Sequence, residues 1–170
     1  LPHGLWGLGN LLLQSYLEDD NEALLIGAVA GPALGGIPLA SAFMLAAYEY
    51  DQSEAPPMLL VRKQAKDHGT QNLVEGLDNV DKGTGVLIVE DVVTKGGSTI
   101  LTIESLRAAG VEPKLVIAIV DREAGGLARI KEETGVEARA LFTMTEILNV
   151  SPDDHILFIP NPNEDGEGFF

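Results

Sequence analysis

The chain has 170 residues and a hydrophobic content of 45%, which supplies enough apolar surface for one folded domain and excludes a disordered acidic segment. Lys and Arg number 11 and Asp and Glu 26, so the formal charge is −15. This charge argues against nucleic acid or an anionic membrane as a partner, because both attract clustered positive charge. Cysteine is absent, which excludes a disulfide framework and a thiolate nucleophile and fits the cytoplasm, where we expect the chain to reside.

The first third of the chain predicts a helix, a strand and a second helix. A short helix is expected at Leu11–Leu17, a strand at Ala23–Ala30, a glycine-rich loop at Gly31–Gly36 and a buried helix at Ile37–Tyr50. Residues 23–48 carry no charge, but Pro and Gly interrupt this stretch and acidic residues flank it. A membrane span carries basic residues on its cytoplasmic side, so we expect no membrane segment here.

Three continuous apolar runs follow, at Met58–Val61, Val86–Val89 and Leu115–Val120. Runs without polar alternation are typical of strands that are buried on both faces, as in parallel sheets. Helical patterns at Ser98–Ala109 and Leu127–Thr134 are each followed by a glycine, which often ends a helix. This alternation predicts an α/β fold of Rossmann-like type, with a mainly parallel central sheet flanked by helices.

The domain organisation is expected to be simple. We expect a single domain over residues 1–160 and an acidic surface tail over residues 161–170. In open parallel sheets, ligands bind beyond the carboxyl ends of the strands. The segments after Ala30, Val61 and Val89 are therefore candidate parts of a binding site.

The segment from Val86 to Thr99 carries the most specific signal. An apolar strand ends in two acids, Glu90 and Asp91, and a loop of glycines and hydroxyls then leads into a helix. The glycines let the backbone approach a ligand closely, and N–H groups at the helix start can hold a phosphate. Two carboxylates would repel a phosphate unless they accept hydrogen bonds from sugar hydroxyls or attract Mg²⁺, so the segment suits a phosphorylated sugar. The hydroxyls expected to add donors to the phosphate are those of Thr94, Ser98 and Thr99.

This string resembles the phosphoribosyl-pyrophosphate (PRPP) signature of type I phosphoribosyltransferases: four hydrophobic residues, two acids, two hydrophobics, then Thr-x-Gly-Gly-Ser/Thr. The resemblance implies that Glu90 and Asp91 hold the ribose 2- and 3-hydroxyls, with Asp91 counted as catalytic, and that the loop binds the 5-phosphate. The PRPP-binding residues implied in this segment are Glu90, Asp91, Val92, Val93, Thr94, Lys95, Gly96, Gly97 and Ser98.

A second segment, Arg62–Thr70, is similar to the mobile catalytic loop of orotate phosphoribosyltransferases. It holds three of the 11 basic residues, and a long polar loop after a buried strand is a candidate lid. The resemblance implies that Lys66 and His68 are catalytic and close over the departing pyrophosphate. The PRPP-binding residues implied here are Arg62, Lys63, Lys66 and His68.

A third segment, Gly31–Ala40, resembles the pyrophosphate-binding loop of the same family. The residues that match this loop are Ala33, Leu34 and Gly35. No cation lies inside the segment, so it can offer only backbone N–H groups to an anion. Such loops sometimes contain an unusual peptide bond.

A fourth segment, Val120–Gly126, follows another predicted strand. The resemblance implies that Arg122 binds the carboxylate of orotate, for which a guanidinium fork is well suited. It also implies that Thr94 lies near the base.

The resemblance spans Leu24 to Leu148 and has one departure, which lies at the N-terminus. Members of the family begin with a Ser-Gly-x-x-Ser-type stretch and a basic residue that help to cover orotate and phosphate. Residues 1–6 do not match that stretch, and no Lys or Arg precedes Arg62. We expect either that the family's N-terminal segment is missing from this chain or that its base-binding wall differs.

The resemblance implies transfer of the 5-phosphoribosyl group from PRPP to orotate, which gives orotidine 5-monophosphate and pyrophosphate in pyrimidine biosynthesis. It implies a Mg²⁺ cofactor that is held mainly by substrate and water, and a homodimer with active sites shared across the interface. Two alternatives stay open: transfer to another base, and a non-catalytic regulator that senses PRPP. The acidity of the chain also suggests a salt-rich cell interior.

Overall fold

The structure, a computed structural model, describes residues 2–18, 24–52, 55–62 and 73–150. The helices and strands, with the 3₁₀ turn η2, follow in this order: α1 (Pro2–Leu17), β1 (Ala28–Pro32), α2 (Gly36–Tyr50), β2 (Met58–Val61), β3 (Val74–Glu75), η2 (Leu77–Asn79), β4 (Gly85–Val93), α3 (Gly97–Ala108), β5 (Glu112–Asp121), α4 (Gly126–Thr134), β6 (Glu137–Thr143) and α5 (Met144–Leu148). The predicted acidic tail lies outside the described residues.

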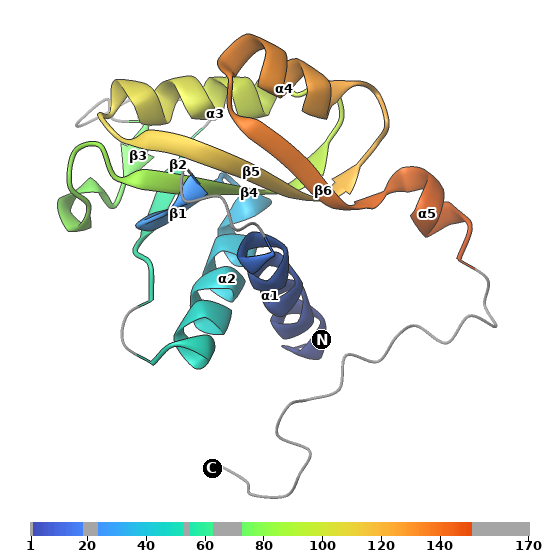
Figure 1. The fold of residues 1–170 in the computed structure, drawn as a ribbon, viewed down its shortest axis with the longest axis horizontal. Coiled ribbons are helices and arrows are strands. Elements are labelled where there is room, and N and C mark those ends of the chain that lie inside the picture. Colours follow the sequence, from blue (N-terminus) through green and yellow to red (C-terminus); the bar gives the residue numbers. More distant parts are fainter. Residues whose placement is uncertain (1, 19–23, 53–54, 63–72, 151–170) are drawn as a thin grey trace, which may run out of the picture.

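The strands form one sheet of six, in the order β3-β2-β1-β4-β5-β6 (Figure 1). All neighbouring pairs are parallel except β2 with β3, which is antiparallel. The predicted α/β fold with a mainly parallel sheet is confirmed. β3, β6 and α5 were not predicted from the sequence.

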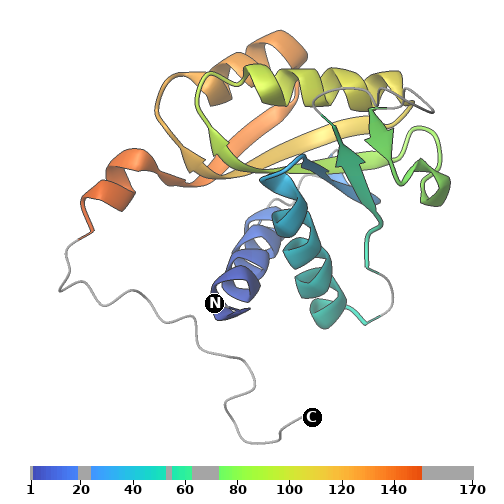
Figure 2. The ribbon, with the colours of Figure 1, turned by 180° about the vertical axis from the view of Figure 1, so that it is seen from behind.

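Helices cover both faces of the sheet: α3 and α4 lie on one face, and α1 and α2 on the other (Figures 1 and 2). The side chains of β4 alternate between the two layers. Val86 and Ile88 belong to the core under α3 and α4, whereas Leu87 and Val89 belong to the core over α1 and α2. The unbroken apolar run therefore reflects burial on both faces.

Strand β4 is longer than the predicted Val86–Val89. It runs through both acids because β5 continues beside it, with Glu90 opposite Ala118 and Val92 opposite Val120. Periodicity could not reveal this extension, since a carboxylate normally ends an apolar run. The two acids therefore lie on a paired strand and not on a loop.

The carboxyl ends of the parallel strands meet at one edge of the sheet. The registers pair Pro32 of β1 with Val61 of β2, and Val93 of β4 with Asp121 of β5. Because of this registry, the four segments singled out from the sequence all leave the sheet at the same edge. No helix in the described part of the chain is long and apolar enough to cross a bilayer.

Candidate active site

The two acids of β4 lie in different environments. Glu90 is buried, with 5% of its surface exposed, whereas the neighbouring Asp91 is exposed. Successive residues of a strand point to opposite faces, which separates the two carboxylates. The Oδ1 atom of Asp91 accepts a hydrogen bond of 2.8 Å from the backbone N–H of Val92, which orients this carboxylate at the strand end.

The buried carboxylate of Glu90 is held from the first turn of α3. The hydroxyl of Thr99, itself 1% exposed, donates to Glu90 Oε1 at 2.9 Å. A hydroxyl has only one proton to donate, and here it goes to Glu90. The expectation that Thr99 adds a donor to a phosphate is therefore wrong, because its hydroxyl points into the core and donates to Glu90 of β4.

The predicted pyrophosphate loop lies directly against Asp91. A Cβ atom added to Gly35 would collide with Asp91 Oδ2, so the carboxylate of Asp91 lies directly against the loop backbone and would have to move to admit a larger residue. The peptide bond between Ala33 and Leu34 is cis, in line with the unusual bond expected for this loop. Two segments that are 56 residues apart in the chain (91 − 35) thus form one surface.

The start of α2, which follows this loop, is also packed closely against the sheet. A Cβ atom on Gly36 would lie 2.6 Å from the carbonyl oxygen of Val89 and 2.6 Å from Cδ of Pro32. The loop is therefore pressed against β4, one strand away, and its backbone rather than its side chains forms the wall of the site. Leu34, the middle residue of the predicted loop, is exposed.

The predicted phosphate loop connects β4 to α3. Gly96 has a φ of 73°, in the left-handed region that favours glycine, and it precedes α3 without any side-chain cap. The first N–H groups of α3 are consequently available to an anion. Lys95 and Ser98 are exposed beside them, whereas the side chain of Val93 is buried in the core, so that Val93 could meet a ligand only through its backbone.

Arg122 lies at the end of β5, next to this loop. Its backbone N–H donates to the carbonyl of Val93 at 2.9 Å, which ties the β5 end to the β4 end. Its side chain is exposed and makes no hydrogen bond or ion pair with any residue that the structure describes. A guanidinium in this state is open to a carboxylate ligand.

The next residue, Glu123, was not found by sequence reasoning. It has a φ of 58°, which is uncommon for a residue other than glycine, and its Oε2 atom accepts from the N–H (2.8 Å) and hydroxyl (2.5 Å) of Thr145. The carboxylate next to Arg122 is thereby committed to α5. No local pattern could reveal this contact, because its partners are 22 residues apart.

The predicted catalytic loop is described only at its first residue. Arg62 forms an ion pair of 2.9 Å with Glu75 of β3, and its backbone N–H donates to the carbonyl of Leu73. Lys63, Lys66 and His68 lie outside the described residues.

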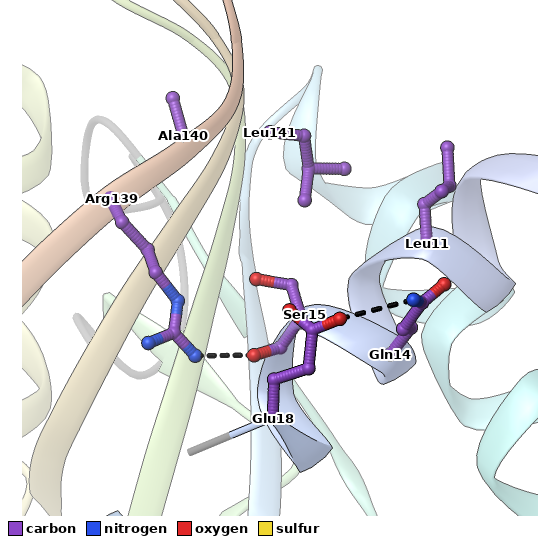
Figure 3. A pocket seen from close by; sticks show the side chains of 7 residues that line it. All are labelled: Leu11, Gln14, Ser15, Glu18, Arg139, Ala140 and Leu141. Carbon is purple, nitrogen blue, oxygen red and sulfur yellow. Dashed lines mark hydrogen bonds between the residues drawn. The ribbon is translucent and has the colours of Figure 1, made fainter.

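A separate pocket of about 540 Å³ lies between α1 and β6 (Figure 3). Arg139 crosses it and donates to the backbone oxygen of Ser15 at 2.5 Å, while Gln14 donates to Glu18 at 3.0 Å. None of its lining residues belongs to the predicted site. Over the described ranges, no group of three or more His, Asp or Glu side chains could hold a metal ion on its own.

The chain matches a known protein family over most of its length. A family model for the phosphoribosyl transferase domain matches residues 6–145. A crystal structure of Mycobacterium tuberculosis orotate phosphoribosyltransferase in complex with PRPP superposes with a TM-score of 0.67 and 27% identity, over 84% of this chain and 75% of that chain.

Curated relatives carry the same name. An orotate phosphoribosyltransferase of Nostoc sp. is 39% identical over 147 residues, which cover 86% of this chain but only 66% of the relative, or about two thirds of its length. One from Halobacterium salinarum is 40% identical over 162 residues, which cover 88% of this chain and 86% of the relative. The chain therefore belongs to the phosphoribosyltransferase family and, within it, to the orotate phosphoribosyltransferases, which confirms the resemblance in the sequence.

Proposed function

We propose that the chain transfers the 5-phosphoribosyl group of PRPP to orotate, giving orotidine 5-monophosphate and pyrophosphate in pyrimidine biosynthesis. The observation that carries this proposal is the contact between Asp91 and Gly35 at the edge where the phosphate loop also begins. A sugar held by Asp91 would have its 5-phosphate near one loop and its pyrophosphate near the other. The names of the relatives support orotate as the base.

The roles of the residues follow from where each segment leaves the sheet. Glu90 and Asp91 orient the ribose, residues 94–98 hold the 5-phosphate, and Arg122 holds the orotate carboxylate. Orotate N1 gives up its proton to the leaving pyrophosphate or to water and bonds to ribose C1 as the bond from C1 to pyrophosphate breaks. The pyrophosphate leaves with the bonding electrons, so charge builds up on it. The residues assigned to neutralise that charge are Arg62, Lys63, Lys66 and His68, together with the backbone of residues 33–35.

Mg²⁺ is the proposed cofactor. Carboxylate oxygens are the ligands that Mg²⁺ prefers in proteins, and the exposed Asp91 offers them beside the predicted pyrophosphate loop. The bound ion would neutralise phosphate oxygens and fix their orientation. Because the described residues offer no cluster of three ligands, substrate and water would complete its shell.

We infer that the functional unit is a homodimer in the cytoplasm. Pro38, Ser41, Leu45 and Tyr48 follow a spacing of three and four along α2, which places them on one face of the helix. Leu45 is 64% and Tyr48 52% exposed, although α1 and the sheet already cover the other faces of α2. The exposed Leu34 of the pyrophosphate loop lies just before α2 in the chain, so a second copy seated on this helix would lie near the site.

The dimer can be tested by light scattering of the purified chain. We expect a dimer at micromolar concentration and a folded monomer for the double variant L45E/Y48E, because two buried carboxylates would oppose the interface. The exposed Leu101 of α3, on the opposite face of the sheet, provides the control variant L101E, which should remain dimeric. A monomeric wild-type chain would contradict the inference.

The base can be tested with a panel. With PRPP and Mg²⁺ present, the chain should consume orotate and leave uracil, adenine and hypoxanthine unchanged. Preference for a purine would favour the alternative of another base. Binding of PRPP with no turnover of any base would favour the PRPP-sensing regulator.

A further inference from the structure

The phosphate loop is in backbone contact with the start of α4. A Cβ atom on Gly126 would lie 2.5 Å from the carbonyl oxygen of Thr94 and 2.9 Å from the nitrogen of Gly96. Conversely, a Cβ atom on Gly96 would lie 2.8 Å from the carbonyl oxygen of Gly126. The loop therefore rests on α4, and a residue on the next turn of that helix is close enough to act on it.

Arg129 is that residue. Its Nη1 atom donates to the carbonyl oxygen of Lys95 at 3.1 Å, and a Cβ atom on Gly97 would lie 3.9 Å from the same Nη1. Its Nε atom donates to Glu133 Oε1 at 2.7 Å, one turn further along α4. The guanidinium is thus held at two points, one on the helix and one on the loop.

This arrangement fixes a peptide plane of the phosphate loop. A peptide unit is planar, so a held Lys95 carbonyl also fixes the direction of the Gly96 N–H. A guanidinium is protonated at neutral pH in any case, and the hydrogen bond and charge of Glu133 raise the pKa of Arg129 further. The Glu133 carboxylate offsets the charge of Arg129, so what Arg129 supplies to the loop is the hydrogen bond to the Lys95 carbonyl.

We propose that Arg129 is a positioning residue for PRPP: it holds the phosphate loop in its binding conformation through the Lys95 carbonyl. The proposal rests on the proposed function for the identity of the ligand. It assigns a role to a residue outside all four motifs of the sequence. Arg129 is about half exposed, so its replacement leaves the core intact.

The test compares R129M with K131M in the full chain. Lys131 lies on the same helix and pairs with Glu137 at 2.8 Å, so the two variants lose equal charge from α4 but only one loses the loop contact. In calorimetry with PRPP and Mg²⁺, R129M should bind at least fivefold more weakly than the wild type, and K131M within twofold of it. In hydrogen exchange without ligand, the peptide over residues 94–98 should exchange at least fivefold faster in R129M only.

The outcomes separate the two proposals. Unchanged affinity and exchange in R129M would overturn the positioning role, and an equal loss in K131M would do so as well, since charge alone would then explain it. Hydrogen exchange requires no ligand, so it decides the role even if the wild type fails to bind PRPP, which would count against the proposed function. A wild type that binds PRPP but leaves orotate unchanged would likewise contradict only the proposed function.

Discussion

The hydrogen bond from Thr99 to Glu90 gives the sharpest prediction about the site. Thr99→Val keeps the shape of the side chain and removes the hydroxyl, which leaves a buried carboxylate with one donor fewer. A hydrogen bond to a charged group contributes about 1.5–3 kcal/mol. We expect the free energy of unfolding to fall by an amount in this range. Because Glu90 is proposed to hold a ribose hydroxyl, PRPP affinity should also fall, by about tenfold for each 1.4 kcal/mol that the site loses.

Two control variants make this test specific. T99S keeps the hydroxyl and should retain the affinity of the wild type for PRPP. T102V removes another buried hydroxyl from α3, one that donates to the backbone oxygen of Ser98 at 3.1 Å, and PRPP affinity should hardly change. Urea denaturation measures the free energy of unfolding, and calorimetry with Mg²⁺ present measures PRPP binding. Wild-type stability and affinity in T99V, or equal losses of affinity in T99V and T102V, would refute the reasoning.

Four further predictions concern the loops, α5 and the surface. G35A places a methyl group against Asp91 and should lower PRPP affinity at least tenfold by calorimetry, with the melting temperature within a few degrees of the wild type; full affinity would contradict the contact. R122M should raise the KM for orotate at least tenfold and change that for PRPP less than threefold in steady-state kinetics, and an equal rise in both would argue against the carboxylate role. Hydrogen bonds from Thr143 lower the pKa of Glu146, so the cap of α5 should be present above the usual carboxyl pKa and be lost as the pH falls through the lowered value; hydrogen exchange over 143–150 at several pH values checks this, and protection independent of pH would contradict it. A formal charge of −15 should make thermal stability rise with KCl concentration, and a melting temperature unaffected by salt would count against a salt-rich source.

The central sheet could be predicted because a strand that is buried on both faces has a continuous run of apolar residues. β2, β4 and β5 were found as continuous apolar runs, whereas the strand predicted at Ala23–Ala30 overlaps β1 only at residues 28–30, because β1 continues into Gly31 and Pro32, which were predicted as loop. β6 was missed, since it is an edge strand that alternates with charged residues such as Glu137 and Arg139. β3 is only two residues long, which is too short for any pattern to indicate.

The parts of the candidate site that could be predicted are those whose residues lie close together in the sequence. The two acids and the two glycines lie within the short stretch of residues 90–97, so their pattern can be read from the sequence. The contacts that hold this stretch are not local, because Thr99 donates across to Glu90 of β4 and Arg129 donates to Lys95 from another helix. The contact between Glu123 and Thr145, beside Arg122, also joins distant residues. These contacts depend on the order of the strands in the sheet and on the direction of each side chain. The spacing of residues along the sequence predicts neither.

A crystal structure of the chain with PRPP and Mg²⁺ would test the central claim most directly. The account predicts the ribose hydroxyls on Glu90 and Asp91, the 5-phosphate on the N–H groups of residues 94–98, and the pyrophosphate against residues 33–35. PRPP bound away from this edge of the sheet, for example in the pocket between α1 and β6, would contradict it.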